Sequence, residues 1–343
     1  MATHESDNVN SDKATIKTGQ LWPDWHKALK KFQNSNNPEA IWQLLNTIVP
    51  YVCLWLLMIR SMQLGYSYIW TVILAIPAAA FLVRLFILFH DCVHNSFFRS
   101  KRANTFFGYF LGILVFTSFE DWRFTHLHHH GTYANLDSRG FGDIWTMTLK
   151  EYENSSFLQQ LRYRVYRNPL VLFGLGPLFI FFLFNRFPDV RVKRKERMSV
   201  IFTNLLILAC VLAAAQLIGW RIYVMIQLPV LWLAGSAGIW LFYVQHQFEG
   251  GYWARGSDWE PLRAAMEGSS FYRLPTVLRW FSGNIGYHHV HHLNSMIPNY
   301  HLKKAYDSVP ELQARAPLTI KKSLNCYPLK LWDEDVRKMI AFP

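Results

Sequence analysis

Cysteine is scarce in this chain, and its spacing excludes several kinds of metal and redox site. The 343 residues contain four cysteines, which lie far apart and never form a C-x-x-C motif: Cys53, Cys92, Cys210 and Cys326. This pattern gives no disulfide framework and no thiolate metal site, and it favours a reducing, cytoplasmic side. The sequence also lacks an H-P-G-G haem-binding segment, the cysteine spacing of an iron–sulfur protein and a G-x-G-x-x-G fingerprint.

The N-terminus lacks the pattern of a cleavable signal peptide. Residues 1 to 40 are polar and contain no apolar core followed by a small-residue cleavage site, so the first span is expected to act as the targeting signal. Residues 1 to 20 are predicted to be disordered. Residues 21 to 33 are predicted to form an amphipathic helix that lies either in the lipid headgroup region or against the body of the protein. Its apolar positions recur at helical spacing: Trp22, Trp25, Leu29 and Phe32.

Acidic residues are too few to balance the basic ones. Lys and Arg number 35 against 23 Asp and Glu, which gives a net charge of +12. Such a charge suits nucleic acid, anionic lipid or an acidic protein partner. Because 51% of the residues are hydrophobic and 16% aromatic, and because they gather in long blocks, the composition indicates a membrane protein. Lipid headgroups are then the expected partners of the basic residues, and no nucleic-acid partner is expected.

Four apolar blocks are each about as long as a bilayer requires. We predict that they are transmembrane helices, at residues 47–66, 68–89, 200–218 and 222–244. Two further apolar segments are harder to place, because residues 105–119 are short and contain two glycines and residues 169–187 contain Pro177. The predicted fold is an all-α integral membrane protein with four spans and a cytoplasmic cap. In domain terms, a membrane domain at 41–330 lies between an N-terminal tail with an interfacial helix at 1–40 and a C-terminal tail at 331–343.

Ten of the 14 histidines fall in three short clusters. The first is H-D-C-V-H, whose two histidines are four residues apart and share one face of a helix. The second is H-L-H-H-H at 126–130, and the third is H-H-V-H-H at 288–292. Both fit H-x-x-H-H, in which histidines three or four apart can bind one metal ion while adjacent histidines can serve two. The candidate ligands in these clusters are His90, His94, His126, His129, His130, His288, His291 and His292.

The remaining histidines differ in their relation to these clusters. His246 follows the last span as His90 follows the second, so it is either a ninth ligand or a surface histidine that faces the headgroups. Two histidines fill the x positions of their clusters and are expected to be outside the ligand set: His128 and His289. Three others have no partner at ligand spacing: His4, His26 and His301.

The number of candidate ligands indicates two metal ions. Imidazole suits Zn, Cu, Fe and Ni, so the ligand type alone leaves the metal open. Eight or nine ligands exceed the four that a single zinc ion normally takes. The chain also lacks the repeated Glu-x-x-His pairs of soluble di-iron bundles, so a di-iron centre here would have mainly neutral nitrogen ligands.

The clusters can cooperate only if they lie on one side of the membrane. The second cluster would be stranded on the outer face if residues 105–119 and 169–187 both crossed, so we predict that both segments are interfacial or re-entrant. Basic residues after the second span and before the third, including Arg99 and Arg191, indicate that the shared side is the cytoplasm. Both termini and all the clusters are then expected on the cytoplasmic side of a cell membrane.

At these residues the chain closely resembles the membrane fatty acid desaturase superfamily, whose signature is three histidine boxes. The resemblance extends to H-D-C-V-H-N-S-F-F, N-L-D-x-R-G-x-G-D-I-W-T (135–146), G-I-W-L-F-Y-V-Q-H-Q-F-E (238–249) and G-N-I-G-Y-H-H-V-H-H-L (283–293), which are similar to acyl-lipid desaturases of the Bacillus type. It covers residues 40 to 330. The departures are Val93 and Asn95, where related first boxes commonly have glycine.

This resemblance implies a non-haem di-iron centre that uses O2 to insert a cis double bond into a saturated or monounsaturated acyl chain of membrane lipid. All nine histidines, His246 included, match the ligand positions of the superfamily. An unactivated methylene has no acidic proton, so the cofactor must supply the oxidising chemistry. Two electrons per turnover must come from a separate carrier, such as an acidic ferredoxin or flavodoxin.

Several acidic or amide side chains near the clusters are candidates for orienting the ligands: Asp91, Glu120, Asp121, Asp143 and Asn284. Each of these could equally be a solvated loop residue or an ion-pair partner. Two alternatives to desaturation also stay open. A hydroxylase would use the same histidine scaffold, and a metal transporter would carry ionisable residues in mid-span, which these spans almost lack.

Overall fold

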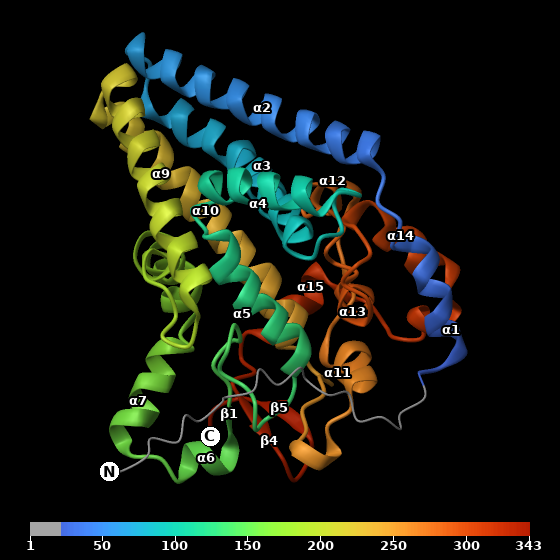
Figure 1. Ribbon diagram of the computed structural model, residues 1–343. Coiled ribbons are helices and arrows are strands. Elements are labelled where there is room, and N and C mark those ends of the chain that lie inside the picture. The colour runs from blue at the N-terminus through green and yellow to red at the C-terminus, as the bar shows by residue number, and fades with distance from the viewer. Residues whose placement is uncertain (1–21) are drawn as a thin grey trace, which may run out of the picture.

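Four long helices dominate the computed structural model, which describes residues 22–343 (Figure 1). They are α2 (Asn37–Gln63), α3 (Tyr68–Val93), α9 (Arg194–Ile218) and α10 (Trp220–His246). At 25 to 27 residues each, they exceed the about 20 residues that cross a bilayer. The prediction of an all-α membrane fold with four spanning helices is thus confirmed. α2 and α9 begin before the predicted apolar blocks because their first turns are polar.

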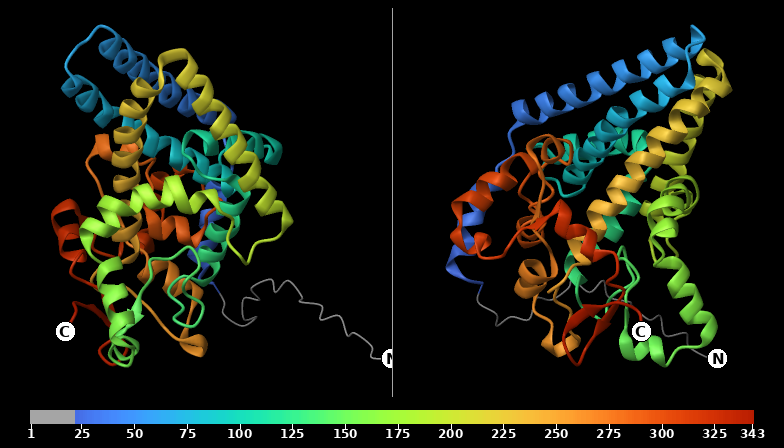
Figure 2. Two further views of the ribbon diagram at one scale, coloured as in Figure 1. Left: turned by 90° about the vertical axis from the view of Figure 1, so that its left-hand side faces the viewer. Right: turned by 180° about the vertical axis from the view of Figure 1, so that it is seen from behind.

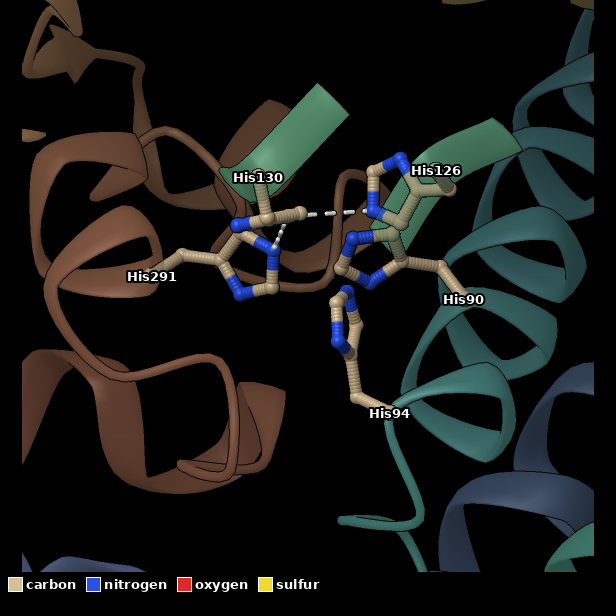
Figure 3. A group of neighbouring side chains, drawn as sticks. All are labelled: His90, His94, His126, His130 and His291. Atoms are coloured by element: carbon tan, nitrogen blue, oxygen red, sulfur yellow. Dashed lines mark hydrogen bonds between the residues drawn. The ribbon is translucent and has the colours of Figure 1, made fainter. Parts of the chain in front are cut away.

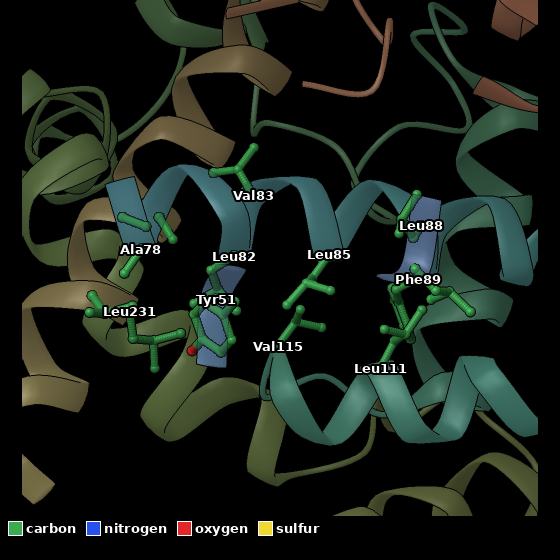
Figure 4. Packing of buried hydrophobic residues seen from close by; sticks show 14 of the residues in the cluster. Tyr51, Ala78, Leu82, Val83, Leu85, Leu88, Phe89, Leu111, Val115 and Leu231 are labelled. Atoms are coloured by element: carbon green, nitrogen blue, oxygen red, sulfur yellow. The ribbon is translucent and has the colours of Figure 1, made fainter. Parts of the chain in front are cut away.

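The four helices form two hairpins that pack on each other through α3 and α10. The short connections of both hairpins lie at the same end of the molecule (Figures 1 and 2). α3 is the central helix: it packs against α2, α10 and α4 (Lys101–Leu114), and its last three turns are buried on all sides. Leu85 of α3 meets Val115, and Phe89 lies near Leu111 (Figure 4). α2 and α9 expose many apolar side chains, as helices that contact lipid do.

α4 and the segment after α7 (Phe157–Tyr166) correspond to the two apolar segments that were harder to place. α4 has 14 residues, about 21 Å of helix, which is too short for a bilayer core of about 30 Å. A sharp turn joins it to α5 (Phe119–Thr132). In the middle of α4, Gly108 is required where α5 packs against the helix, because a Cβ there would lie 2.1 Å from Phe119 Cε2.

The second segment is a broken helix. Two π-helical turns, η2 (Leu170–Leu175) and η3 (Phe179–Leu183), flank α8 (Gly176–Leu178), and the 3₁₀ turn η4 (Phe184–Arg186) ends the segment. The segment is bent by 58° relative to α7, which is the shape of either a broken span or a re-entrant loop. The predicted one-sided placement of this segment and of α4 stays a prediction.

The remaining elements form a cap at the end of the bundle opposite the hairpin connections. The helices and turns of the cap are α6 (Leu149–Glu153), η5 (Gly256–Asp258), α11 (Pro261–Gly268), α12 (Thr276–Phe281), α13 (His288–Leu293), α14 (Asn299–Ser308), η6 (Pro310–Gln313), α15 (Ile320–Ser323) and η7 (Leu324–Cys326). β2 (Tyr272–Arg273) pairs in parallel with β3 (Leu318–Thr319). In the second sheet, β1 (Met147–Thr148) pairs in parallel with β4 (Leu331–Asp333), and β4 pairs antiparallel with β5 (Lys338–Ile340).

The last 13 residues are therefore an integral part of the cap. Residues 331–343 are expected from the sequence to form a C-terminal tail, whereas Leu331, Trp332 and Met339 are buried in the structure. The partner strand β1 lies far away in the sequence, at Met147–Thr148. A pairing over such a distance leaves no local signal in a segment this short.

The described part of the N-terminal region packs against the cap. It consists of α1 (Asp24–Lys27) and the 3₁₀ turn η1 (Ala28–Phe32). Leu29 is fully buried in a cluster with Leu302 and Ile297, and His26 Nε2 lies 3.3 Å from the carbonyl oxygen of Leu293. Of the two placements considered for this helix, the structure shows the one against the body of the protein. The predicted disorder of residues 1 to 20 and the position of His4 lie outside the described residues.

Candidate metal centre

Four helices bring the histidine clusters together at the junction of the bundle and the cap. His90 is in the last turn of α3, and His94 follows directly as its C-cap. α5 carries the second cluster, α13 carries the third, and His246 is the last residue of α10. Helical spacing places each pair of ligands from one cluster on the same side of its helix. The folding of the bundle then makes these sides face one another.

Five imidazoles form the first group. One ring nitrogen from each of them lies within 4.8 Å of the others, and they are His90, His94, His126, His130 and His291 (Figure 3). Nε2 of His130 lies 3.2 Å from Nε2 of His126 and 3.0 Å from Nε2 of His291. All three clusters contribute to this group. Figure 3 shows the rings of α3, α5 and α13 converging on a common centre.

Three imidazoles form a second group, and a fourth adjoins it. Ring nitrogens of His129, His246 and His292 lie within 4.8 Å of one another. Nε2 of His288 lies 2.9 Å from Nε2 of His246 and 3.1 Å from Nε2 of His292. The two groups touch, because the rings of His130 and His292 stack with their centroids 4.2 Å apart. The structure thus brings all nine sequence-predicted histidines together, and adjacent histidines of one cluster belong to different groups.

The spacing of the nitrogen atoms fits metal ligation. Contacts between facing Nε2 atoms range from 2.9 to 3.2 Å. Two nitrogens bound at about 2.1 Å to one ion and about 90° apart are about 3.0 Å from each other, whereas a tetrahedral site separates them by about 3.4 Å. The spacing therefore resembles that of an ion with more than four ligands.

The protonation state of the rings also suits the binding of a cation. Burial, and then the neighbouring imidazoles, hold the pKa of His126, His130 and His291 well below 6.5. These rings are neutral at pH 7 and each offers one lone pair. Both ring nitrogens of His94 are buried without a hydrogen-bond partner among residues 22–343. A buried polar group of this kind is normally satisfied, and a bound ion would satisfy it.

Two of the predicted orienting carboxylates contact ligands. Asp91 Oδ1 lies 3.3 Å from Nδ1 of His90, and Asp143 Oδ1 accepts a hydrogen bond from Nδ1 of His129. Such contacts fix the orientation of the ring and make its other nitrogen a better ligand. Each group of histidines therefore contains one ring held by a buried carboxylate.

The other three predicted orienting residues bond to groups other than the histidine ligands. Asn284 Nδ2 donates to the carbonyl oxygen of Asn299 at 3.0 Å, and Asn299 in turn holds Asp91. Glu120 forms an ion pair of 2.8 Å with Lys195 and contacts no histidine ring. Asp121 accepts a hydrogen bond of 3.4 Å from the backbone N–H of Asp189. Sequence reasoning missed Asn299, since it lies beyond the third cluster at the start of α14 and nothing local marks it.

The histidines set aside by spacing lie outside both groups. His128 is exposed and packs against Phe141, with ring centroids 4.5 Å apart. His289 points away from the centre, and its Nε2 lies 3.1 Å from the carbonyl oxygen of Leu312. His301 likewise contacts a backbone carbonyl, that of Phe32.

An apolar cavity of ≈ 240 Å³ reaches both groups of histidines. Its walls come mainly from α3 and α10, with Phe181 and Gly238 among the lining residues, and it ends at His90, His126 and His288. Trp122 stacks on His126 with centroids 4.2 Å apart and an interplanar angle of 16°. The arrangement places a mainly apolar space beside the nitrogen ligands.

Fold and site together define a membrane-bound enzyme with a histidine-rich metal site beside an apolar cavity. The family model for fatty acid desaturases matches residues 67–323, and the chain belongs to this family. It is therefore a desaturating oxidoreductase of fatty acyl chains, in agreement with the resemblance stated above. Asn95, one of the two departures from related first boxes, has a positive φ of 56°, a conformation in which glycine is the usual residue.

Curated relatives agree with this assignment. A fatty acid desaturase of Bacillus subtilis is 43% identical over 316 residues, which is 92% of this chain and 89% of that protein. An endoplasmic reticulum omega-3 fatty acid desaturase of Vigna radiata is 28% identical over 65% of this chain and 60% of its own length. The sn-1 acyl-lipid omega-3 desaturase (ferredoxin) of Synechocystis is 25% identical over 66% of this chain and 63% of its own length.

Proposed function

We propose that this enzyme introduces a cis double bond into an acyl chain of membrane lipid at a non-haem di-iron centre, with O2 as co-substrate. The first iron would be held by His90, His94, His126, His130 and His291, and the second by His129, His246, His288 and His292. When bound, the two irons supply the oxidising power that an unactivated methylene requires. The observation that carries the proposal is the apolar cavity that ends at histidines of both groups.

The residues of the chain itself would bind and orient the substrate. The cavity walls are mainly apolar, so an acyl chain would be held by burial of its methylenes, worth about 0.8 kcal/mol for each CH₂. Trp122, which stacks on His126, would press the chain against the nitrogen ligands. Buried Asp91 and Asp143 would keep the imidazoles of His90 and His129 in the tautomer that ligates through Nε2.

The electrons would come from a soluble carrier on the cytoplasmic side, such as ferredoxin or flavodoxin. The name of the Synechocystis relative includes ferredoxin. Near the start of α9, beside α5, the surface carries an exposed basic cluster: Arg191, Lys193, Arg194, Lys195 and Arg197. This cluster would dock an acidic carrier or hold anionic lipid, and we assign most of its charge to lipid. Both termini and the metal centre would face the cytoplasm of a cell membrane.

Lipid analysis of an expressing host tests the reaction. Mass spectrometry of the extracted acyl chains should reveal new double bonds, and their position in chains of known length would define the regiochemistry. Hydroxylated chains without new double bonds would identify a hydroxylase instead. Purified protein that contains zinc and leaves acyl chains unchanged would favour a metal transporter.

Alanine variants of the histidines test the ligand set. His90→Ala, His129→Ala and His291→Ala should each abolish metal binding and desaturation while membrane insertion persists. His128→Ala and His289→Ala are matched controls from the same clusters and should retain at least part of the activity. Full activity of His291→Ala would show that the ligand set is wrong.

A further inference from the structure

A second, polar cavity of ≈ 260 Å³ lies on the other side of α3 from the acyl cavity. α3 presents Val83 and Ile87 to the acyl cavity, whereas Arg84 lines the polar one. The first two turns of α2 and the helix α12 form most of the remaining wall. No ligand of the metal centre lines this cavity, so it is a separate site.

Arg84 is a buried cation whose guanidinium lies over the ring of Trp280, 3.9 Å from its centroid, and it shares the cavity with the carboxylate of Glu39. Arg84 is 3% exposed, and among residues 22–343 it forms no ion pair. Its Nε donates to Thr47 Oγ1 at 3.1 Å, and its Nη1 donates to the carbonyl oxygen of Trp280. Within the described chain Nη2 has no acceptor, although the guanidinium lines the cavity. A charge in this position is costly unless an anion or another acceptor meets it.

A second guanidinium and two amides line the same cavity. The side chain of Arg279, on α12, makes no hydrogen bond or ion pair with any residue from 22 to 343. Gln43 is 5% exposed, and its Oε1 is buried without a partner in the described chain. Asn46 Oδ1 already accepts from Thr47, which leaves the Asn46 amide N–H groups free to donate. The two guanidinium forks and the Asn46 N–H groups can donate to phosphate oxygens, whereas Gln43 Oε1 is an acceptor that suits an N–H donor.

The two helices that carry most of the lining residues, α2 and α12, also expose apolar side chains, and one of these, Trp42, lines the cavity itself. Trp42 of α2 is 61% exposed and Val277 of α12 is 66% exposed. Ile41, Leu45 and Leu278 add further exposed apolar surface to the same two helices. Tryptophan in such a position is typical of the membrane interface. A soluble phosphate ester would leave these side chains in water, whereas the acyl chains of a phospholipid would cover them.

Glu39 is the only acidic residue that lines the cavity within residues 22–343. It lies in the first turn of α2 and forms no ion pair in the described chain. A carboxylate near two guanidiniums is unfavourable for a simple anion, but it complements a headgroup that carries an amine next to its phosphate.

We propose that this cavity binds the headgroup of a phospholipid whose phosphate meets Arg84 and Arg279 and whose amine meets Glu39. The lipid is a resident one, distinct from the acyl substrate, because its site is separated from the acyl cavity by α3. Its chains lie against the exposed apolar surface of α2 and α12. The chemistry assigned is that of phosphatidylethanolamine.

Native mass spectrometry of the detergent-purified full chain tests this site. Wild-type protein should bind one equivalent of added phosphatidylethanolamine more tightly than phosphatidylglycerol, and diacylglycerol, which has no phosphate, should not compete. Arg279→Gln should weaken phosphatidylethanolamine binding roughly tenfold, because it removes one charge-assisted contact. The Arg279 side chain makes no hydrogen bond or ion pair within the described chain, so this variant should fold normally. Arg60→Gln, an exposed arginine at the other end of α2, is the matched control and should bind as wild type does.

Glu39→Gln separates the amine contact from the phosphate contact. It should abolish the preference for phosphatidylethanolamine over phosphatidylglycerol while total phospholipid binding persists. Equal binding of phospholipid to wild type and Arg279→Gln would overturn the phosphate site. Displacement of the lipid by millimolar inorganic phosphate would overturn the assignment to lipid. An unchanged headgroup preference in Glu39→Gln would overturn the assignment to an amine-bearing headgroup.

Discussion

Asn299 holds the carboxylate of Asp91 with two hydrogen bonds, from its backbone N–H at 2.7 Å and from its Nδ2 at 2.9 Å, both to Oδ2. The other oxygen of Asp91 faces Nδ1 of His90. A contact between α3 and α14 therefore sets the orientation of a proposed metal ligand. Asn284 extends the chain of contacts, since it donates to the carbonyl oxygen of Asn299.

Asn299→Ala should reduce both metal retention and desaturation roughly tenfold, because outer contacts of this kind are typically worth 10- to 100-fold. Metal content after dialysis against a chelator, together with the rate of double-bond formation, measures the effect. Asn325→Ala, at an exposed position in the same cap, is the control. Wild-type metal content in the Asn299 variant would contradict a positioning role.

Asp143→Asn should affect mainly the second group of histidines. The amide keeps the shape of the carboxylate but cannot attract the Nδ1 proton of His129 as strongly. We expect the metal content to fall from about two ions to about one per chain. Inductively coupled plasma mass spectrometry of the purified protein measures this content. Asp137→Asn, in the same loop, removes an exposed contact with Arg255 and should leave the metal content unchanged.

Gly238→Leu should narrow the acyl cavity without disturbing the fold. A Cβ at Gly238 meets nothing within 4 Å, and the residue lines the cavity. We expect a larger loss of activity toward long acyl chains than toward shorter ones in a host that contains both. Gly174→Leu adds the same side chain where there is also open space but outside the cavity lining, and should leave chain-length preference unchanged. If Gly238→Leu lost the same fraction of activity for all chain lengths, this cavity would not be the substrate-binding site.

Arg167→Met should destabilise the junction of the cap with α10. The fully buried guanidinium donates to Trp145, Tyr243, Gln247 and Leu329. Removing it leaves the buried acceptors of Trp145 and Gln247 without this donor and should cost about 3 kcal/mol of folding free energy. The thermal unfolding midpoint of purified protein should fall accordingly, whereas Arg162→Met, at an exposed position on the same helix, should leave it unchanged.

Asp121 should make the stability of the protein depend on pH. Burial raises the pKa of this carboxyl, on α5, from 3.8 to about 6. The folded state therefore favours the protonated form, so the stabilising contribution is complete below pH 3.8 and is lost as pH rises through about 6. Asp121→Asn should raise the unfolding midpoint at pH 7 and above and have a smaller effect at pH 5. The exposed Asp307→Asn serves as the control.

The local features of the chain were predictable because each depends on residues that are near one another in the sequence. Apolar blocks of bilayer length define α2, α3, α9 and α10, and the spacing of H-x-x-x-H and H-x-x-H-H places ligands on one side of a helix. His246 could be proposed because it follows the last predicted span as His90 follows the second. The resemblance to desaturases then predicted the family that the comparisons show.

Only the tertiary structure decided which histidines share a group, because each group draws on helices up to 200 residues apart. Asn299 and β1 likewise acquire their roles from partners distant in the sequence, Asp91 and β4. Arg84 illustrates the same limit: its charge is evident in the sequence, but the cavity around it forms only when α2, α3 and α12 meet. Burial and convergence are properties of packed surfaces, and no periodicity within one segment encodes them.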